Sequence, residues 1–93
     1  MSGQVKIMVQ EVGETKEVGA NGFIKRELWG RDEGNQYPQD WKFEFVKDKT
    51  SLLDDVLEGT FITVFYNIRN RKVEQEGKEK MCFTTLQGWK IEI

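Results

Sequence analysis

The 93-residue chain contains no histidine and only one cysteine, Cys82. It therefore cannot form an internal disulfide, and it lacks the usual ligands of a zinc site and the imidazole of a Ser-His-Asp triad. Its glycines, as in GANG and GRDEG, do not have the spacing of a GxGxxG motif or a P-loop. We therefore expect no metal, no cofactor and no enzymatic activity.

Long apolar runs are also missing. No segment approaches the ~20 apolar residues of a membrane-spanning helix, and the N-terminal MSGQVKIMVQEV does not resemble a secretory signal. We expect a cytoplasmic protein that does not bind membranes. The length, with 38% hydrophobic and 12% aromatic residues, is enough for one small core, so residues 1–93 are predicted to form a single domain.

The net charge is only −2, but the basic residues are unevenly distributed. Residues 21–31 are basic overall, and residues 59–72 contain basic residues and no acidic ones, whereas the segments beside them are acidic. The basic residues of these two segments are Lys25, Arg26, Arg31, Arg69, Arg71 and Lys72. This pattern is typical of a protein with one cationic face.

Alternation of apolar and polar residues predicts five strands. They are residues 4–12, residues 23–31, a third strand ending at Val46, residues 60–73 and residues 81–93. Pro38 has no N–H to donate, so the region before the third strand is an edge, a bulge or a loop. The polar, glycine-rich residues 13–22 join the first two strands, and Gly88 is a candidate bulge or point of close approach.

Between the third and fourth strands the periodicity changes. Apolar residues at positions i, i+1, i+4 and i+5 of residues 48–59 predict a short helix. Asp48, Thr50 or Ser51 can cap its start, and Gly59 can end it in a left-handed conformation.

The predicted order is three strands, a short helix and two strands. Five short strands avoid exposed edges by closing into a barrel, with the helix covering one end. A sandwich-like or SH3-like barrel is an alternative, but a helix between strands three and four is specific to the OB-fold. The expected fold class is therefore mainly β, a five-stranded OB-fold barrel with a short helix between strands 3 and 4.

Several segments together resemble single-stranded DNA-binding proteins. A glycine precedes the second strand, the pair Asp40-Trp41 opens the third, and Gly59 leads into a strand that ends in Arg-Asn-Arg-Lys at 69–72. Over nearly its whole length the chain is also similar to a family of small uncharacterised bacterial and phage OB proteins with QYPQ-like and NIR-x-R stretches. The resemblance implies an OB-fold that binds single-stranded DNA, with a role in DNA replication.

The second strand carries the first candidate binding residues. Lys25, Trp29 and Arg31 have the parity opposite to Ile24 and Leu28, so they are predicted to project outward from the barrel. Trp29 would then offer a platform on which a base can stack between cations. The alternative is a partly buried indole shielded by long side chains.

The third strand offers Trp41 and Lys42. Trp41 shares its face with Phe43 and Phe45, so in a regular strand it belongs to the core, whereas a bulge near Asp40 would turn it outward. Both readings remain open. Lys42 is a candidate phosphate contact.

Further candidates lie in the connections. Tyr37 precedes the third strand, where an OB ligand often lies, although Tyr-Pro is also an ordinary turn pair. Arg69, Arg71 and Lys72 end the fourth strand and enter the next loop, where they can contact phosphates or form a solvated basic turn.

The remaining notable residues are expected to be structural. Tyr66, Trp89 and most phenylalanines should pack in the core or in an interface, and Cys82 should be a small packed thiol. Arg26 breaks the apolar parity of its strand, which suggests a structural ion pair or a DNA contact at a barrel end.

These features predict binding of single-stranded DNA with little sequence preference, by base stacking on exposed aromatic residues and phosphate contacts from lysine and arginine. RNA is a possible ligand as well. The alternative is an OB-fold interaction module that binds itself or a protein partner without nucleic acid. Self-association into a homo-oligomer is expected in either case, because a small barrel with many aromatic residues can bury some of them between subunits.

Overall fold

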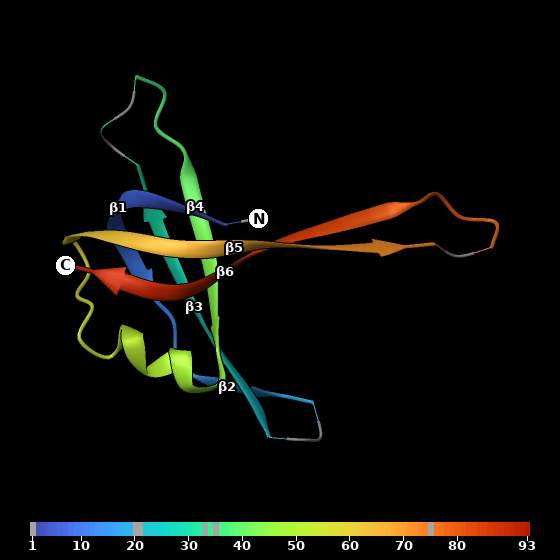
Figure 1. Cartoon of the computed structure of the whole chain (residues 1–93), viewed down its shortest axis with the longest axis horizontal. Helices are drawn as coiled ribbons and strands as arrows, with labels where there is room; N and C mark the ends of the chain where they lie inside the picture. The colour runs from blue at the N-terminus through green and yellow to red at the C-terminus, as the bar shows by residue number, and fades with distance from the viewer. Residues whose placement is uncertain (1, 20–21, 33, 35, 75) are drawn as a thin grey trace.

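The computed structural model describes residues 2–19, 22–32, 34, 36–74 and 76–93. Five long strands close into a ring, and a short helix lies at one end of it (Figure 1). The strands are β1 (Ser2–Val12), β3 (Phe23–Arg31), β4 (Asp40–Val46), β5 (Phe61–Val73) and β6 (Met81–Glu92). The predicted five-stranded OB-fold barrel is confirmed, and each predicted strand corresponds to one strand of this ring.

β1 closes the ring because it pairs with two neighbours. Its first part is antiparallel to β5, and its last part is antiparallel to β3 after an irregularity between Val9 and Glu11. β3 continues to β4 and β5 to β6 through antiparallel pairing, while β4 meets β6 in parallel at Glu44 and Gln87. Closure lets strands that would otherwise be edges satisfy their backbone hydrogen bonds.

The core contains the inward-facing residues of the alternating strands. Leu53 of the helix and Val56 of the segment after it complete the core at the end of the barrel where the helix lies. A β-carbon at Gly88 would overlap the ring of Phe45, so the expected close approach at this glycine is confirmed. The buried apolar residues are Ile7, Val9, Leu28, Phe43, Phe45, Leu53, Val56, Ile62 and Val64.

The predicted short helix is present as η1 (Lys47–Leu53), but its length and cap differ from the prediction. It is a 3-10 helix that ends well before Gly59, and its N-cap is Val46, which makes no side-chain capping bond. The hydroxyls of Thr50 and Ser51 donate instead to backbone carbonyls three residues earlier, at 2.8 and 2.9 Å. Such local bonds compete with a regular α-helix, which explains the shorter element. Gly59 does adopt a left-handed conformation (φ 83°), in the turn before β5.

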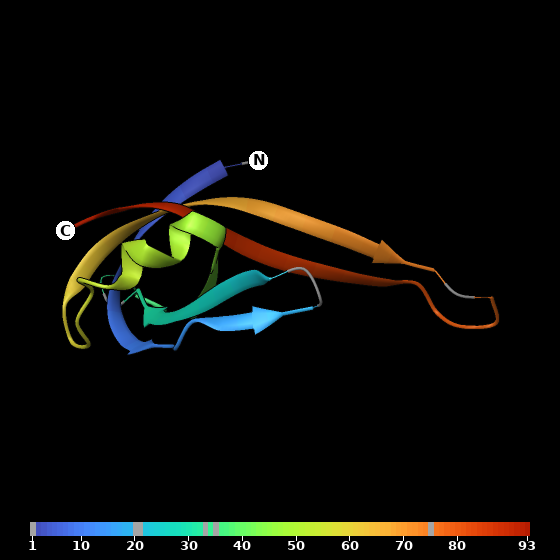
Figure 2. The same cartoon turned by 90° about the horizontal axis from the view of Figure 1, so that it is seen from below.

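Two hairpins extend away from the barrel (Figures 1 and 2). Part of the segment expected to be only a connection forms β2 (Lys16–Val18), which pairs with the start of β3. The far halves of β5 and β6, residues 69–73 and 81–85, continue past the barrel as a two-stranded ribbon, here called the β5–β6 arm. Within the described ranges, no helix is long and apolar enough to span a membrane.

Candidate nucleic-acid interface

β3 presents Trp29 on the outside of the barrel, as the alternation predicted. Leu28 is completely buried, and the neighbouring Trp29 is 40% exposed. The outer side of β3 and β4, formed by Lys25, Glu27, Trp29, Lys42 and Glu44, is called the β3–β4 face below.

Lys42 is the basic neighbour of the exposed indole. It lies directly opposite Trp29 in the antiparallel pair, and its Nζ is 5.5 Å from the centre of the indole ring. This distance is within the range of a cation–π interaction. The other cross-strand neighbour of Trp29 is Glu11 of β1. The indole is therefore bordered by a cation on one side and a carboxylate on the other.

The β3–β4 face carries mixed charge, so it is not the cationic face that the charge pattern predicts. Lys25 Nζ lies 3.5 Å from Glu44 Oε1, and Lys42 Nζ lies 3.6 Å from Glu27 Oε2. Glu27 and Glu44 have the same outward parity as the lysines, which is why these pairs can form.

Arg31 and Tyr37 mark the far end of this face. Arg31 is half-buried and lies opposite Asp40 of β4. Tyr37 is 77% exposed in the connection between β3 and β4, which is closed by an Asp32 N–H donated to the Gln39 carbonyl at 3.2 Å. Tyr37 lies outside any strand, as Pro38 indicated.

Trp41 faces the interior and packs against the core as a partly buried side chain, so of its two alternatives the structure shows the core orientation. The β3–β4 register runs without a bulge, so Trp41 keeps the parity of Phe43. Its ring lies 5.8 Å from Phe43 and 5.9 Å from Tyr66, between centroids. Its Nε1 is buried and has no hydrogen-bond partner among the described residues. Trp41 therefore contributes to packing together with Phe43 and Tyr66.

Arg26 has a structural role. Its Nε donates to the carbonyl of Gly13 at 2.7 Å, and its Nη1 contacts Asp54 Oδ1 at 2.8 Å. The side chain thereby joins β3 to the segment after β1 and to the turn after the helix. Of the two roles considered for Arg26, the structure shows the ion pair.

The β5–β6 arm carries Arg69 and Arg71 on one of its sides. Arg71 lies opposite Phe83, and Arg69 lies opposite Thr85 and contacts Gln87 Oε1 from its Nε at 3.1 Å. Residues that oppose each other in a ladder share one side of it. Phe83 is 51% exposed. An exposed ring and two arginines therefore share one side of the arm.

Lys72 occupies the other side of the arm. It opposes Cys82, and its Nζ lies 3.2 Å from Glu74. All three basic residues belong to the last part of β5, as the predicted strand over residues 60–73 implies, and the loop begins only after Val73. Cys82 is exposed, so the expected packed thiol is wrong, because the arm continues beyond the core.

Phe83 is an exposed aromatic residue that is not among the candidates predicted from the sequence. The phenylalanines are predicted mostly to pack, yet Phe23, Phe61 and Phe83 are all more than one-third exposed. A signal for Phe83 was available, because it has the parity opposite to Leu86 and both cannot face the core in one regular strand. The hairpin register then decides that Phe83 opposes Arg71.

A groove joins the β3–β4 face to the base of the arm. It has a volume of about 310 Å³ and is lined by Lys42 and Glu44 on one side and by Thr84, Thr85 and Leu86 on the other. Of the candidate residues, Lys42 lines this groove. Trp29 lies on the face that the groove adjoins, and Arg69, Arg71 and Phe83 lie on the arm. An extended polymer with flat bases and phosphates can use such an arrangement.

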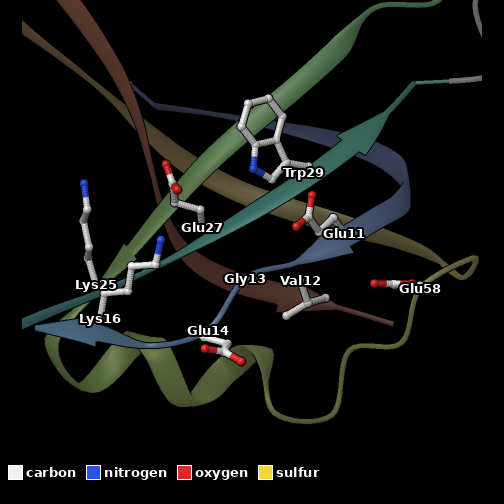
Figure 3. A pocket seen from close by; sticks show the side chains of 9 residues that line it. All are labelled: Glu11, Val12, Gly13, Glu14, Lys16, Lys25, Glu27, Trp29 and Glu58. Atoms are coloured by element: carbon white, nitrogen blue, oxygen red, sulfur yellow. The ribbon is translucent and has the colours of Figure 1, made fainter.

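A second hollow, of about 410 Å³, lies on the other side of Trp29 (Figure 3). Its charged lining is mixed. Trp29, Glu11 and Glu58 line one end, whereas Lys16 and Lys25 line the opposite end, with Glu27 between them (Figure 3). The carboxylates do not form a metal centre: across the described ranges, no group of three or more His, Cys, Asp or Glu side chains could hold an ion.

The parts of β5 and β6 that belong to the barrel carry a separate group of aromatic residues on their outer side, here called the outer aromatic area. The rings of Phe65 and Trp89 lie 5.6 Å apart, and Lys90 Nζ is 5.0 Å from the Phe65 ring. Phe61 is 52% exposed and has Lys6 Nζ at 5.8 Å from its ring. Trp89 is therefore on the surface of the barrel and not in its core.

Solved structures of three proteins have the same fold at low sequence identity. The SSB domain of a Synechococcus sp. protein has a TM-score of 0.73 and 15% identity, with 99% of this chain and 93% of that one covered. The mitochondrial single-stranded DNA-binding protein Rim1 of S. cerevisiae has a TM-score of 0.64 and 14% identity, with 98% and 93% covered. A small single-stranded DNA-binding protein from Streptomyces coelicolor has a TM-score of 0.50 and 15% identity, with 99% and 92% covered.

Comparisons of sequence give one family. None of the curated proteins matches the chain. The sequence profile described as "Domain of unknown function (DUF3127)" matches residues 4–92.

Proposed function

The chain belongs to the DUF3127 family, and we propose that it acts as one OB-fold domain that binds single-stranded DNA with little sequence preference. The observation that carries the proposal is the pair of exposed rings beside basic side chains, Trp29 with Lys42 on the β3–β4 face and Phe83 with Arg71 on the arm. A groove lined by Lys42 and Thr84 connects the face to the base of the arm. The single-stranded DNA-binding proteins that share the fold support it.

In this proposal the strand crosses the β3–β4 face and continues along the arm. A base stacks on Trp29, which at 40% exposure leaves part of its ring open. The Lys42 ammonium moves from the ring toward a phosphate, a small change for a half-exposed lysine. Arg69 and Arg71 contact further phosphates, and a second base stacks on Phe83. Each stacked base contributes ~1–3 kcal/mol.

The phosphate contacts should be few. Lys25 and Lys42 have carboxylate neighbours, and Arg26 is occupied by Asp54 and Gly13. Arg31, Arg69 and Arg71 have no carboxylate within ion-pair distance among the described residues. Roughly one to four neutralised phosphates give a shallow dependence of affinity on salt, with a logarithmic slope of about −0.7 per phosphate. RNA has the same phosphates and bases, so it is expected to compete.

Tryptophan fluorescence tests the proposal directly. We expect titration with oligo-dT at low salt to quench the emission, and titration with duplex DNA of the same length to leave it nearly unchanged. The matched variant Trp29→Phe should lose most of this response, because Trp41 packs against the core and Trp89 lies outside the proposed interface. Absence of any response to single-stranded DNA or RNA at low salt contradicts the proposal.

The outer aromatic area favours a second candidate, self-association into a homo-oligomer. Phe61, Phe65 and Trp89 expose apolar surface that a second subunit can cover. Light scattering on the eluting protein should then give a mass above 10.9 kDa for the wild type. The double variant Phe61→Ser/Trp89→Ser should shift toward the monomer mass. A monomeric wild type at micromolar concentration contradicts this candidate and leaves DNA binding unaffected.

A further inference from the structure

The side of Trp29 away from the groove has a different chemistry from the side toward it. Across β4 the indole faces Lys42, and across β1 it faces Glu11. Figure 3 shows Glu11 and Glu27 beside the indole, with Glu58 directed toward the same hollow from the segment before β5. The hollow, at about 410 Å³, has a volume in the range of small-molecule sites, ~300–1,000 Å³.

This asymmetry orients a nucleotide on Trp29. A phosphate is attracted to the Lys42 ammonium and repelled by the carboxylate of Glu11, which no ion pair neutralises among the described residues. A nucleotide whose base stacks on the indole therefore lies with its phosphate toward β4 and the groove. The hydrogen-bonding edge of its base then points toward β1 and the hollow.

A carboxylate selects the base edge that it meets, because an ionised carboxylate only accepts hydrogen bonds. Guanine presents two adjacent donors, N1–H and the N2 amino group, which match the two oxygens of one carboxylate. Cytosine and adenine present one amino donor. Thymine flanks its single N3–H with two carbonyl oxygens, which the carboxylate repels.

Glu11 is the carboxylate best placed to read this edge. It is exposed, directly opposite Trp29, and has no ion pair among the described residues. Glu27 is already 3.6 Å from Lys42, so it helps to hold that ammonium near the ring. Glu11 thus has both oxygens available as acceptors.

We infer that the hollow beside Trp29 is a base-reading subsite in which Glu11 accepts hydrogen bonds from an amino-bearing base, guanine above all. The inference rests on the proposed function and adds one selective position to a surface that otherwise binds any sequence. Glu11 is a specificity-determining residue of this subsite, and Trp29 supplies its stacking surface.

Three labelled oligonucleotides of about ten nucleotides test the subsite by fluorescence anisotropy. One is all thymidine, one has a single central deoxyguanosine, and one has deoxyinosine there, which keeps N1–H but lacks the amino group. A single guanine prevents quadruplex formation, and a short strand can slide until the preferred base lies on Trp29. The guanine oligonucleotide should bind at least about fivefold more tightly than oligo-dT, with the inosine oligonucleotide between them.

Two charge-neutralising variants separate base reading from general electrostatics. Glu11→Gln should reduce the guanine preference to less than about twofold, mainly because thymidine binds better without the charge. Glu14→Gln removes the same charge from the same hollow, but Glu14 points away from the indole in Figure 3, so the preference should persist. Equal binding of all three oligonucleotides by the wild type, or an unchanged preference in Glu11→Gln, overturns the inference. Failure to bind any oligonucleotide overturns the proposed function instead.

Discussion

The β3–β4 face and the β5–β6 arm both place a ring beside a basic side chain, but only the first rests on a core. Leu28 and Phe43 beneath the β3–β4 face are completely buried, whereas Phe83 on the arm is half exposed. The lysines of the face have carboxylate neighbours, whereas Arg71 has none among the described residues. The face therefore holds Trp29 in a fixed position with little net charge, and the arm supplies free positive charge on a less constrained ribbon.

The largest expected effect is a loss of stability when a core side chain beneath the β3–β4 face is truncated. Phe45→Ala should lower the free energy of unfolding by about 3–5 kcal/mol, because the ring is completely buried and touches Gly88. Phe83→Ala on the arm should change it by less than about 0.5 kcal/mol. Urea denaturation followed by circular dichroism measures both. Similar losses in the two variants would show that the arm is packed as tightly as the barrel.

The next largest expected effect is a loss of DNA affinity when one exposed indole, that of Trp29, is removed. Trp29→Ala should weaken binding of oligo-dT by about 1–3 kcal/mol with little change in melting temperature, because it removes one stacking surface. Trp89→Ala is the matched control, since Trp89 is equally exposed at 40% but lies outside the proposed interface. Fluorescence anisotropy at low salt measures the affinities. If the two variants lose equal affinity, the β3–β4 face is not the binding surface.

The smallest expected effect is a change in the salt dependence of DNA binding when a single arginine is replaced. Arg71→Gln should make the logarithmic salt slope shallower by about 0.7, corresponding to one phosphate contact, and leave stability unchanged. Arg26→Gln should leave the slope unchanged but destabilise the fold by about 1–3 kcal/mol, because its bonds to Gly13 and Asp54 are lost. Anisotropy titrations at several salt concentrations, with melting curves, distinguish the two. A slope that responds to Arg26 and not to Arg71 would move the phosphate path from the arm to the barrel end.

Much of the fold was predictable because a strand alternates its side chains with a period of two. That alternation located the five ring strands, placed Leu28 inside and Trp29 outside, and favoured the core for Trp41 in a regular strand. The helix between the third and fourth ring strands was expected as well. Its 3-10 form was not, because the local bonds of Thr50 and Ser51 depend on backbone geometry that apolar spacing does not encode.

The cross-strand neighbours of each residue could be known only from the tertiary structure. Alternation assigns a side to each residue, but the partner on the next strand depends on register, which pairing and barrel closure determine. Register placed Glu11 and Lys42 on opposite sides of Trp29 and placed Phe83 against Arg71. It also brought Glu44 and Glu27 next to the lysines of the β3–β4 face. The local sequence thus determined which side chains face outward, and long-range pairing determined the neighbours that give each of them its chemistry.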